Sequence, residues 1–406
     1  IIILSFLDCQ QKFSIRLNNV PRVDREVGRF HRDVLDGRQP SFFFASIRLK
    51  FWSMKKPISL GLIFGGRSAE HEVSITSARA IFCHLSQKRY HVHSIYITRE
   101  GHWKQVSSPL VSDQELKEGQ TFSFLPWSPP GQQAELKADV YFPVLHGPYG
   151  EDGTIQGLLE MADVPYVGSP VLASAVGMDK VIFKNLLSYL GLPVTPYLVL
   201  GEEDYKNQGS KLIRKINSVF AYPLFVKPAN MGSSVGISKV KRRAALPAAL
   251  DLAFRYDRKI LVEKAIAGRE IECSVLGNDS PEASLPGEVI PYREFYDYDD
   301  KYLEGKTRFR IPAELPADLT RKIRELALAA FKAIDACGLA RVDFFLEKET
   351  NAIYINEINT MPGFTEISMY PKLWEVSGLS FNQLLDRLIE LAIERHSQKK
   401  RCLERT

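Results

Sequence analysis

The sequence predicts an α/β protein in which a doubly wound parallel-sheet domain is followed by two α+β units. Three observations lead to this prediction. Buried-strand patterns alternate with helical patterns between residues 58 and 162, which is typical of a parallel sheet. The pattern changes near residue 169, and a hairpin of two long strands follows at 341–359.

The first region, 54–168, is expected to bind a ligand at one edge of its sheet. Its expected elements are strand 58–64, helix 68–85, strand 90–98, strand 139–147 and helix 154–162. Gly65-Gly66 and His146-Gly147 follow or end two of these strands. Ligands of parallel α/β sheets bind beyond the carboxyl ends of the strands, so this edge is the candidate site.

The rest of the chain is predicted to form units 169–265 and 266–397, with a tail at 398–406. The first unit is expected to contain helix 178–191, strands 223–229 and 236–240, helix 244–257 and strand 259–266. The second is expected to contain strand 269–277, helix 319–338, strands 341–346 and 353–359, and a last helix. That last helix should begin at the capping box Ser380-x-x-Gln383, because a serine and a glutamine at this spacing satisfy free backbone N–H groups.

Composition and charge indicate a globular protein that binds neither nucleic acid nor membranes. Charged residues make up 25% of the chain, which is ordinary for such proteins, and no apolar run approaches the roughly 18–20 residues that cross a bilayer. The five cysteines form no CxxC pair, which argues against a zinc ribbon and fits a reducing, cytoplasmic location. The net charge is +5, but residues 1–53 carry nine basic and five acidic side chains and so supply four of these charges. The remainder has no basic stripe for nucleic acid.

Residues 1–53 are expected to lie outside the fold. They show no sustained helical or strand period, and Met54 stands just before the first predicted strand. The apolar start IIILSFL lacks the basic residues and cleavage site of a secretory signal. We interpret the segment as upstream sequence that is not part of the protein proper, with a disordered extension or a targeting peptide as alternatives.

The stretch FVKPANMGSSVGISKV (225–240) contains a lysine beside a glycine-rich loop. A Walker-type phosphate loop runs from a strand into a helix with the pattern GxxxxGK[ST]. Here Lys227 precedes the glycines and a strand follows, so we predict the tip of a β-hairpin. The hydroxyls of Ser233 and Ser234 and the loop N–H groups are suited to phosphate oxygens, but an ordinary hairpin turn fits the stretch equally well.

The C-terminal hairpin supplies a candidate metal site. Its turn near 348–351 should place Asp343 within about one register step of Glu357 across the ladder, and Asn359 shares a face with Glu357. Three oxygen ligands of this kind suit Mg²⁺ bound to nucleotide phosphates. The alternative is a solvated strand face whose charges are unrelated.

Seven motifs along the chain resemble those of the D-alanine–D-alanine ligase family of ATP-grasp enzymes. In order they are GGRSAEHEVS, LHGPYGEDGTIQG, MDK, VKPANMGSSVG, FYDYDDKY, RVDFF and NEINTMPGFTEISMYP. They cover the chain from Met54 to about His396, and residues 1–53 have no counterpart. The resemblance implies the ATP-grasp fold, in which the two α+β units hold ATP between them.

The resemblance also implies how ATP is bound. The implied contacts are Lys180 and Lys227 at the α- and β-phosphates, Ser233 and Ser234 in the loop, Lys301 at the γ-phosphate, Glu263 with Ala265 and Ile266 at adenine, and Glu270 at the ribose. Asp343, Glu357 and Asn359 would hold two Mg²⁺ ions, with Mn²⁺ as a substitute.

The implied reaction joins two D-alanines for peptidoglycan precursor synthesis. The carboxylate of the first D-alanine attacks the γ-phosphate, and the amine of the second then attacks the acyl phosphate. Arg341 and the N–H of Gly363 would stabilise the tetrahedral oxyanion. No protein nucleophile is needed, and positioning and charge neutralisation carry the catalysis.

Five further residues are implied around the substrates. Glu70 would bind the ammonium group of the first D-alanine, and Ser233 and Tyr302 would link to Glu70 and so close two loops that exclude water. His146 is implied near the first substrate and Ser368 at the carboxylate of the second. Whether His146 transfers protons is left open.

Three alternatives to this function remain: a D-alanine–D-lactate ligase, a different carboxylate–amine ligase and a non-enzymatic nucleotide sensor. The pair Lys301-Tyr302 resembles the pattern for an amine rather than a hydroxy acid as second substrate. A sensor should have lost members of the metal and oxyanion sets, and this sequence retains them. The family's usual assembly implies a homodimer.

Overall fold

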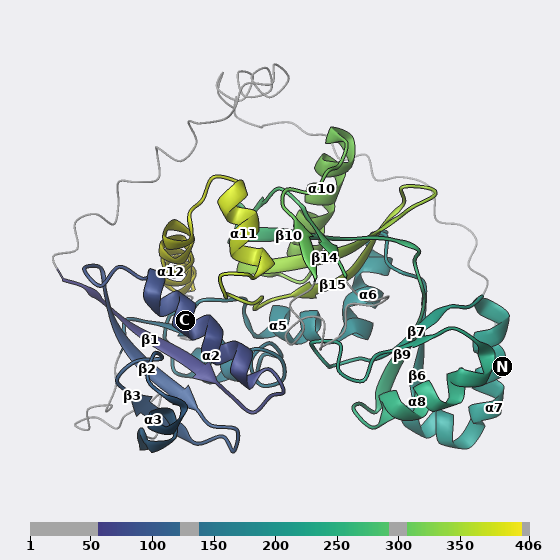
Figure 1. Ribbon diagram of the computed structural model, residues 1–406, viewed down its shortest axis with the longest axis horizontal. Helices are drawn as coiled ribbons and strands as arrows, with labels where there is room; N and C mark the ends of the chain where they lie inside the picture. The colour runs from purple at the N-terminus through teal and green to yellow at the C-terminus, as the bar shows by residue number, and fades with distance from the viewer. Residues whose placement is uncertain (1–55, 122–137, 292–306, 400–406) are drawn as a thin grey trace, which may run out of the picture. The chain divides into compact units, whose positions relative to one another are not determined.

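Three β-sheets organise the part of the chain that the computed structural model describes, namely residues 56–121, 138–291 and 307–399 (Figure 1). The predictions for Lys301, Tyr302 and the segment 1–53 fall outside the described residues. The predicted boundaries between the three regions stay a prediction, although each sheet takes its strands from one of these regions.

The first sheet has the strand order β4-β3-β2-β1-β5. Its strands are β1 (Ile58–Gly65), β2 (Tyr90–Ile97), β3 (Trp103–Val106), β4 (Gln120–Thr121) and β5 (Val140–Pro143). The predicted parallel arrangement holds for β2, β1 and β5 only, because β3 and β4 are antiparallel strands that the sequence analysis did not anticipate. Between these two strands lies the short helix α3 (Asp113–Glu118).

One hydrophobic core joins the first sheet to the end of the chain. Leu60 of β1, Ile81 of α2 (His71–His84) and Leu388 of α12 (Phe381–Gln398) belong to the same buried cluster. The capping box that starts α12 is present as predicted, with the side chain of Gln383 accepting from the Ser380 N–H. On the described helices, no segment is both long and apolar enough to cross a bilayer.

The second sheet is antiparallel throughout, with the order β6-β9-β7-β8. Its strands are β6 (Tyr197–Gly201), β7 (Leu224–Pro228), β8 (Ser238–Val240) and β9 (Lys259–Lys264). The predicted hairpin is confirmed, because β7 and β8 pair with Phe225 opposite Lys239. Strand β6 and the polar helix α7 (Glu202–Val219), in which only Ile216 is buried, were not predicted. The predicted helix 244–257 is a short 3-10 turn (Arg243–Ala245) followed by α8 (Leu246–Phe254).

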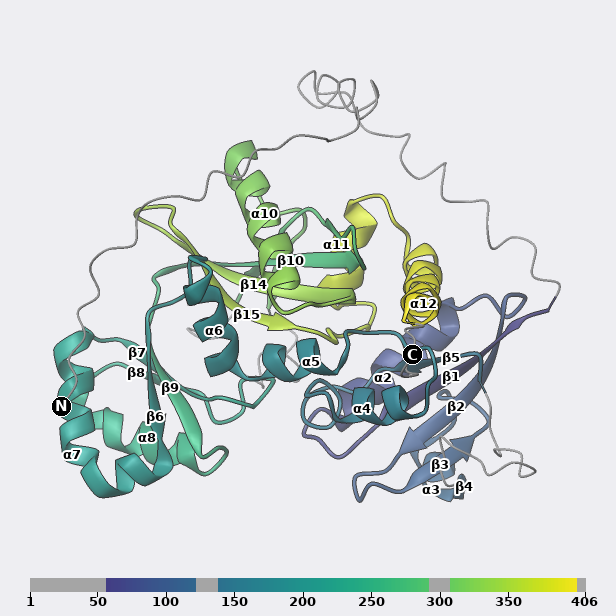
Figure 2. The same ribbon diagram turned by 180° about the vertical axis from the view of Figure 1, so that it is seen from behind.

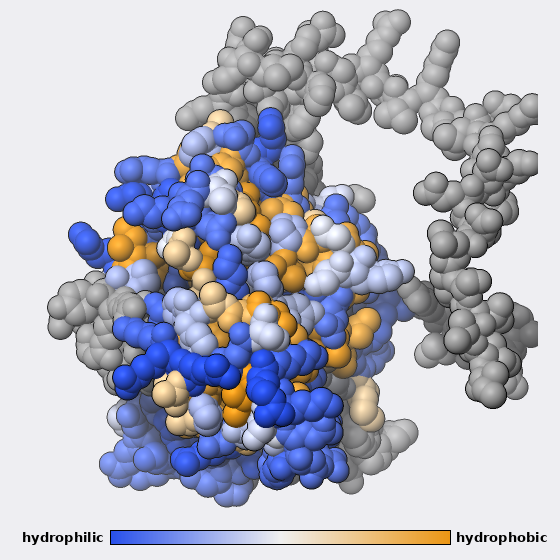
Figure 3. Space-filling view, turned by 90° about the vertical axis from the view of Figure 1, so that its right-hand side faces the viewer, coloured by the Kyte–Doolittle hydropathy of each residue, from blue (hydrophilic) through white to orange (hydrophobic). Residues whose placement is uncertain are grey.

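Hydrophilic residues dominate the face of the molecule in Figure 3, which is the side of Figure 1 where α7 is drawn. Hydrophobic residues are scattered between them in the same view. This distribution agrees with an α7 that contributes little to the core, since its sequence from Glu202 to Lys215 is mostly charged or polar.

The third sheet has the order β13-β12-β10-β14-β15, with β11 attached to β10. Its strands are β10 (Gly268–Gly277), β11 (Glu282–Ala283), β12 (Gly287–Ile290), β13 (Arg308–Arg310), β14 (Gly338–Glu347) and β15 (Ile353–Asn359). Helix α10 (Ala317–Ala333) covers one face together with α5 (Val171–Met178) and α6 (Lys180–Tyr189) (Figure 2). The predicted helix 319–338 ends at Ala333 because Asp335 and Gly338 adopt left-handed backbone conformations, which interrupt a right-handed helix.

Side chains alternate between the two faces of β10. Ile271, Cys273 and Val275 belong to the core under α10. The alternate residues Glu270, Glu272 and Ser274 therefore point to the opposite face. On that face the Ser274 hydroxyl donates to the carbonyl of Tyr370 in α11 (Met369–Val376). This second face is the one that carries the candidate site.

The predicted helix 178–191 is two helices, α5 (Val171–Met178) and α6 (Lys180–Tyr189). Asp179 between them has an extended backbone, and its carboxylate accepts from the N–H groups of Val181 and Ile182. An aspartate in this role is a preferred N-cap, so MDK marks a helix start rather than a helix interior. Lys180 is thereby fixed as the first residue of α6.

The first region also contains α4 (Thr154–Met161).

Candidate active site

Three carboxylates form a row across the face of the third sheet that is turned away from α10. Glu272 of β10 is paired with Asp343 of β14, which is in turn paired with Glu357 of β15. The predicted proximity of Asp343 and Glu357 is therefore confirmed as a direct cross-strand pair. Glu272 was missed, although its position two residues after Glu270 on the same strand face was a signal for it.

Arg341 binds two members of this row. Its Nε and Nη2 donate to the two carboxylate oxygens of Asp343, each at 2.7 Å, and Nε lies 3.0 Å from Oε2 of Glu272. Burial lowers the pKa of Arg341, but Asp343 and Glu272 outweigh burial and raise this pKa well above its usual value. The predicted oxyanion-binding arginine thus lies in the candidate site as a fixed cation.

The predicted metal ligands lie together beside this arginine. Asn359 donates through Nδ2 to Oδ2 of Asp343 at 3.0 Å, and Glu357 is the next residue of the row. Among the described residues, no group of three or more His, Cys, Asp or Glu side chains is arranged as a metal centre. Two carboxylates and an amide nevertheless fit Mg²⁺, because this ion commonly takes one or two protein carboxylates and completes its shell with phosphates and water.

The two lysines predicted at the phosphates are each paired with an acid of the site. Lys180 Nζ lies 3.2 Å from Oε2 of Glu357 and donates to the carbonyl of Met231 at 2.9 Å. Lys227 Nζ lies 2.6 Å from Oε2 of Glu263 and donates to Asn356 at 3.1 Å. Strands from two different sheets and the start of α6 therefore meet at β15.

A second lysine contacts Glu263, and the sequence analysis missed it. Lys184 Nζ lies 3.0 Å from Oε1 of Glu263, and its side chain is fully buried. Burial raises the pKa of Glu263, but Lys184 and Lys227 outweigh this effect and lower the pKa, so the carboxyl group is ionised. The signal was present, since Lys184 stands four residues after Lys180 and so shares its helix face.

The residues predicted at the adenine and ribose lie along the connection from β9 to β10. Glu263 is in β9, Ala265 donates through its N–H to the carbonyl of Pro223 at 3.3 Å, and Ile266 follows before β10 begins at Gly268. Glu270 is on the same face of β10 as Glu272. These predicted contacts therefore continue from the acidic row toward the second sheet.

Glu70 occupies the edge of the first sheet, in the N-cap position of α2. The chain turns there at Gly65, where a Cβ would come within 2.2 Å of the Ile97 carbonyl oxygen. The Glu70 carboxylate accepts a hydrogen bond from the Ser233 hydroxyl. Ser233 and Ser234 lie in the loop of the β7–β8 hairpin, and both have a positive φ. The predicted contact between Glu70 and Ser233 is present, whereas the one with Tyr302 lies outside the described residues.

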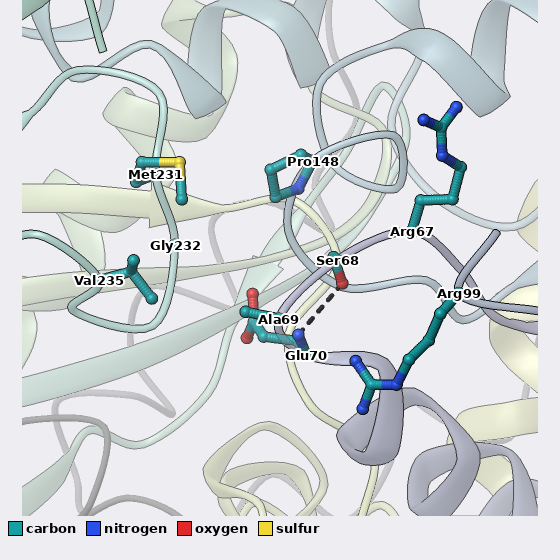
Figure 4. A pocket seen from close by; sticks show the side chains of 9 residues that line it. All are labelled: Arg67, Ser68, Ala69, Glu70, Arg99, Pro148, Met231, Gly232 and Val235. Carbon is teal, nitrogen blue, oxygen red and sulfur yellow. Dashed lines mark hydrogen bonds between the residues drawn. The ribbon is translucent and has the colours of Figure 1, made fainter. Parts of the chain in front are cut away.

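A pocket of about 380 Å³ opens beside Glu70 (Figure 4). Gly232 from the hairpin loop and Pro148 from the segment after β5 form parts of its wall. A Cβ on Gly147 would lie 2.7 Å from Oε2 of Glu70, and a Cβ on Gly232 would lie 2.9 Å from the same oxygen. Glycine at both positions lets these loops approach the carboxylate so closely, and at Gly147 the backbone also has a positive φ of 72° that glycine adopts readily.

His146, Gly363 and Ser368 meet at the segment between β15 and α11. His146 is 3% exposed, and its Nδ1 lies 3.0 Å from the carbonyl oxygen of Met361. A Cβ on Gly363 would come within 2.8 Å of the Ser368 hydroxyl. That hydroxyl accepts from the N–H of Thr365 at 3.0 Å. Ser368 is the residue immediately before α11. The structure thus brings all three predicted residues to one segment.

Glu151 is a further titratable residue that the sequence analysis missed. Its Oε1 accepts from the Gly147 N–H at 3.0 Å and lies 3.9 Å from Nδ1 of His146. Burial, and after it the negative charge of Glu70, raise the pKa of Glu151 to about 8. The acidic dipeptide after HGPYG was visible in the sequence, but only the fold shows that Glu151 keeps just 14% of its side chain exposed.

We expect Glu151→Gln to change how stability depends on pH. The folded protein retains a proton on Glu151 up to a pKa of about 8, whereas the unfolded chain loses it near 4.5. Native stability therefore falls as the pH rises through this window. The substitution should remove this fall. The difference in unfolding free energy between the variant and the unsubstituted protein should therefore change in the variant's favour by on the order of 3 kcal/mol from pH 4 to pH 9. Thermal unfolding across this range is the measurement, with exposed Glu325→Gln as control; parallel pH curves for Glu151→Gln and the unsubstituted protein would contradict it.

Buried Lys227 on the second sheet and buried Lys180 and Lys184 on α6 lie beside the acidic row and the arginine of the third sheet, an arrangement typical of ATP-grasp ligases. The family models described as D-ala D-ala ligase N-terminus and D-ala D-ala ligase C-terminus match residues 59–169 and 186–390. The chain belongs to the D-alanine–D-alanine ligase family. The predicted family, fold class and ligase character are thereby confirmed.

Sequence relatives and solved structures agree with this assignment. The D-alanine--D-alanine ligase of Bacillus pumilus is 48% identical over 353 residues, which is 84% of this chain and 98% of the relative. The one from Heliobacterium modesticaldum is 50% identical over 353 residues, with 84% and 96% covered. The solved D-alanine-D-alanine ligase from Coxiella burnetii superimposes with a TM-score of 0.75 at 40% identity, over 85% of this chain and 96% of that one. The VanG D-Ala:D-Ser ligase from Enterococcus faecalis has a TM-score of 0.74 at 35% identity, over 83% and 100%.

Proposed function

We propose that this protein joins two D-alanine molecules into D-alanyl-D-alanine at the expense of ATP, which becomes ADP and phosphate, and so supplies a peptidoglycan precursor. The observation that carries the proposal is the pairing of buried lysines with carboxylates in the site. Two buried lysines, Lys180 and Lys227, are held by carboxylates that phosphates and a divalent cation can replace. Relatives at 48–50% identity carry the same activity in their names.

ATP binding exchanges the partners of these lysines. The triphosphate offers them several anionic oxygens, so Lys180 and Lys227 bind phosphate and release Glu357 and Glu263. Asp343, Glu357 and Asn359 would hold Mg²⁺ or Mn²⁺, which supplies charge neutralisation at the transferring phosphoryl group. Glu270 accepts from the ribose hydroxyls, and the Ala265–Ile266 segment contacts the adenine.

Two steps at the carboxyl group of the first D-alanine then make the peptide bond. An oxygen of the first D-alanine carboxylate attacks the γ-phosphorus, and the bond to ADP breaks. The amine of the second D-alanine attacks the acyl phosphate carbon and loses a proton, and inorganic phosphate leaves. Arg341 and the Gly363 N–H stabilise the oxyanion of the intermediate between these events.

The substrates are held by groups at the edge of the first sheet and at the start of α11. Glu70 accepts from the ammonium group of the first D-alanine, and Ser233 fixes the orientation of that carboxylate through its hydrogen bond. The Ser368 hydroxyl donates to the carboxylate of the second D-alanine. Lys301 and Tyr302 are proposed to complete the site at the γ-phosphate and at Glu70.

D-Alanine rather than D-serine or D-lactate is proposed as the second substrate. The relatives at 48–50% identity are D-alanine--D-alanine ligases, whereas the D-Ala:D-Ser ligase is 35% identical. We also propose a cytoplasmic homodimer and the three-part division 54–168, 169–265 and 266–397.

Phosphate release from ATP and Mg²⁺ by the full chain tests this function. The substrates would be D-alanine, L-alanine, D-alanine with D-serine, and D-alanine with D-lactate, and products would be identified by mass. Release with D-alanine alone, giving the dipeptide, is the expected result. Mixed products in excess of the dipeptide would reassign the second substrate, and release that is independent of any amino acid would overturn the proposal.

A further inference from the structure

A closed chain of hydrogen bonds connects the first sheet to the segment that carries Gly363. His146 Nε2 lies 3.0 Å from the Ser77 hydroxyl of α2. The same hydroxyl receives the N–H of Phe364 at 3.3 Å. Nδ1 of His146 lies 3.0 Å from the carbonyl oxygen of Met361. Both ends of the segment Met361–Phe364 are therefore bound by one pair of buried side chains.

The chemistry of these groups determines which atom donates and which accepts in each of these hydrogen bonds. A carbonyl oxygen only accepts, so Nδ1 of His146 must carry a proton to bind Met361. Burial lowers the pKa of His146, against the raising effects of Glu70 and the Met361 carbonyl, so the ring is neutral at pH 7. Nε2 is then an acceptor, and the Ser77 O–H must donate to it while its oxygen accepts from Phe364.

Both partners are shielded from water. The Ser77 side chain has no exposed surface, and His146 is 3% exposed. The titratable groups around the ring are Glu151, whose Oε1 is 3.9 Å from Nδ1 and whose raised pKa keeps it protonated at pH 7, and more distantly Glu70 and Arg341. Because both ring nitrogens already bind protein atoms, neither one has a lone pair or proton directed at a substrate.

We propose that Ser77 and His146 are positioning residues that hold the Met361–Phe364 segment at both ends and thereby fix the Gly363 N–H for the oxyanion. His146 does not carry protons in the reaction. This inference rests on the proposed ligase function and adds Ser77 to the residues that reaction needs. An N–H displaced by about 1 Å loses much of its effect on the transition state, so holding this segment is a requirement of the chemistry.

Kinetics of Ser77→Ala, His146→Ala and the double variant form the first test. Each single substitution should lower kcat for dipeptide formation by about 10- to 100-fold, with the KM for ATP unchanged within about twofold. The double variant should be little worse than either single one, because both act through one chain. Ser94→Ala is the matched control: Ser94 is also buried, and among the described residues its hydroxyl has no hydrogen-bond partner.

His146→Asn separates positioning from proton transfer. The asparagine amide can occupy the place of Nδ1 and donate to the Met361 carbonyl, but it cannot shuttle protons. Positioning predicts that His146→Asn retains at least about fivefold more activity than His146→Ala. Equal loss in the two variants, together with loss of a limb of the pH profile of kcat, would establish proton transfer and overturn the proposal.

Nitrogen-15 NMR of the histidine side chains tests the hydrogen-bond chain without any turnover. The His146 signals, assigned by their disappearance in His146→Asn, should report a neutral ring protonated on Nδ1. The Nε2 signal should shift in Ser77→Ala and stay in place in Ser94→Ala. An imidazolium or an Nε2–H tautomer at pH 7 would overturn the inference. If wild-type protein forms no dipeptide while this tautomer is observed, the proposed function fails and the hydrogen-bond chain stands.

Discussion

Arg341→Ala is expected to lower kcat for dipeptide formation by about 10³-fold, the upper range for losing one oxyanion donor. In the proposed reaction, the guanidinium of Arg341 supplies positive charge to the oxyanion. It also holds Asp343 through two hydrogen bonds of 2.7 Å and contacts Glu272 at 3.0 Å. The substitution therefore removes a donor and at the same time releases a proposed metal ligand. Steady-state phosphate release at saturating D-alanine is the measurement.

The same variant should also be less stable. Without the guanidinium, Glu272 and Asp343 lose the cation that both of them contact, on a face where their side chains are only 9% and 14% exposed. Removing one partner of a buried ion pair costs about 3–5 kcal/mol, and we expect about 3 kcal/mol because the Arg341 side chain retains 18% exposure. Added Mg²⁺ should restore part of this stability in the variant.

Two controls define the Arg341 prediction. Arg341→Lys keeps the charge but cannot form the bidentate contact, so it should retain stability better than activity. Arg321→Ala, on the exposed face of α10 with 75% of its side chain accessible, should change neither. A kcat for Arg341→Ala within tenfold of wild type would remove Arg341 from the chemistry.

Glu263→Gln is expected to have the largest effect on folding, at about 3–5 kcal/mol of lost stability. Glu263 lies between Lys184 and Lys227, 3.0 Å from one ammonium group and 2.6 Å from the other. All three side chains are at most 6% exposed. The neutral amide would leave Lys184 and Lys227 without their shared counter-ion, at a place where burial already lowers the pKa of Lys184. Denaturant unfolding measures the loss, and ATP should restore stability because its phosphates compensate Lys227.

Lys184→Met is the matched comparison for Glu263→Gln. It removes one charge from the same triad but leaves the balanced pair of Glu263 and Lys227, while methionine fills a similar apolar volume. We expect it to cost about 1 kcal/mol or less, since an ion pair replaced by apolar atoms is often neutral. If Lys184→Met proves as costly as Glu263→Gln, charge balance is not what stabilises this cluster.

The candidate site was predictable from sequence where its residues are close together along the chain. The alternation of Asp343 with apolar neighbours, and the hairpin that returns Glu357 beside it, follow from the two-residue period of a strand. The lysines at 180 and 227 and the acid at 263 could be named only through the family resemblance. Nothing in their spacing along the chain indicates that Lys227 and Lys184 share Glu263.

Where the fold prediction failed, short-range signals were weak or misread. Asp179 reads as an interior residue of a helical pattern, but its side chain caps α6 and separates this helix from α5. The antiparallel strand β3, only Trp103–Val106, has too few residues for a clear period. Helix α7 was overlooked because its sequence is mostly polar, although Leu212, Ile213 and Ile216 recur at helical spacing and pack on the core of the second sheet.

The sequence by itself determined the family, the order of the three regions and the closeness of Asp343 to Glu357 within about one register step, because these depend on local periods and on motifs read in order. Only the tertiary structure decided which charges face one another. The pairing of Glu263 with Lys184, the placement of Glu272 beside Arg341 and the hydrogen bonds of Ser77 with His146 and Phe364 join residues 69 to 287 positions apart. Burial and charge balance act through space, and a linear pattern does not encode the distances on which they depend.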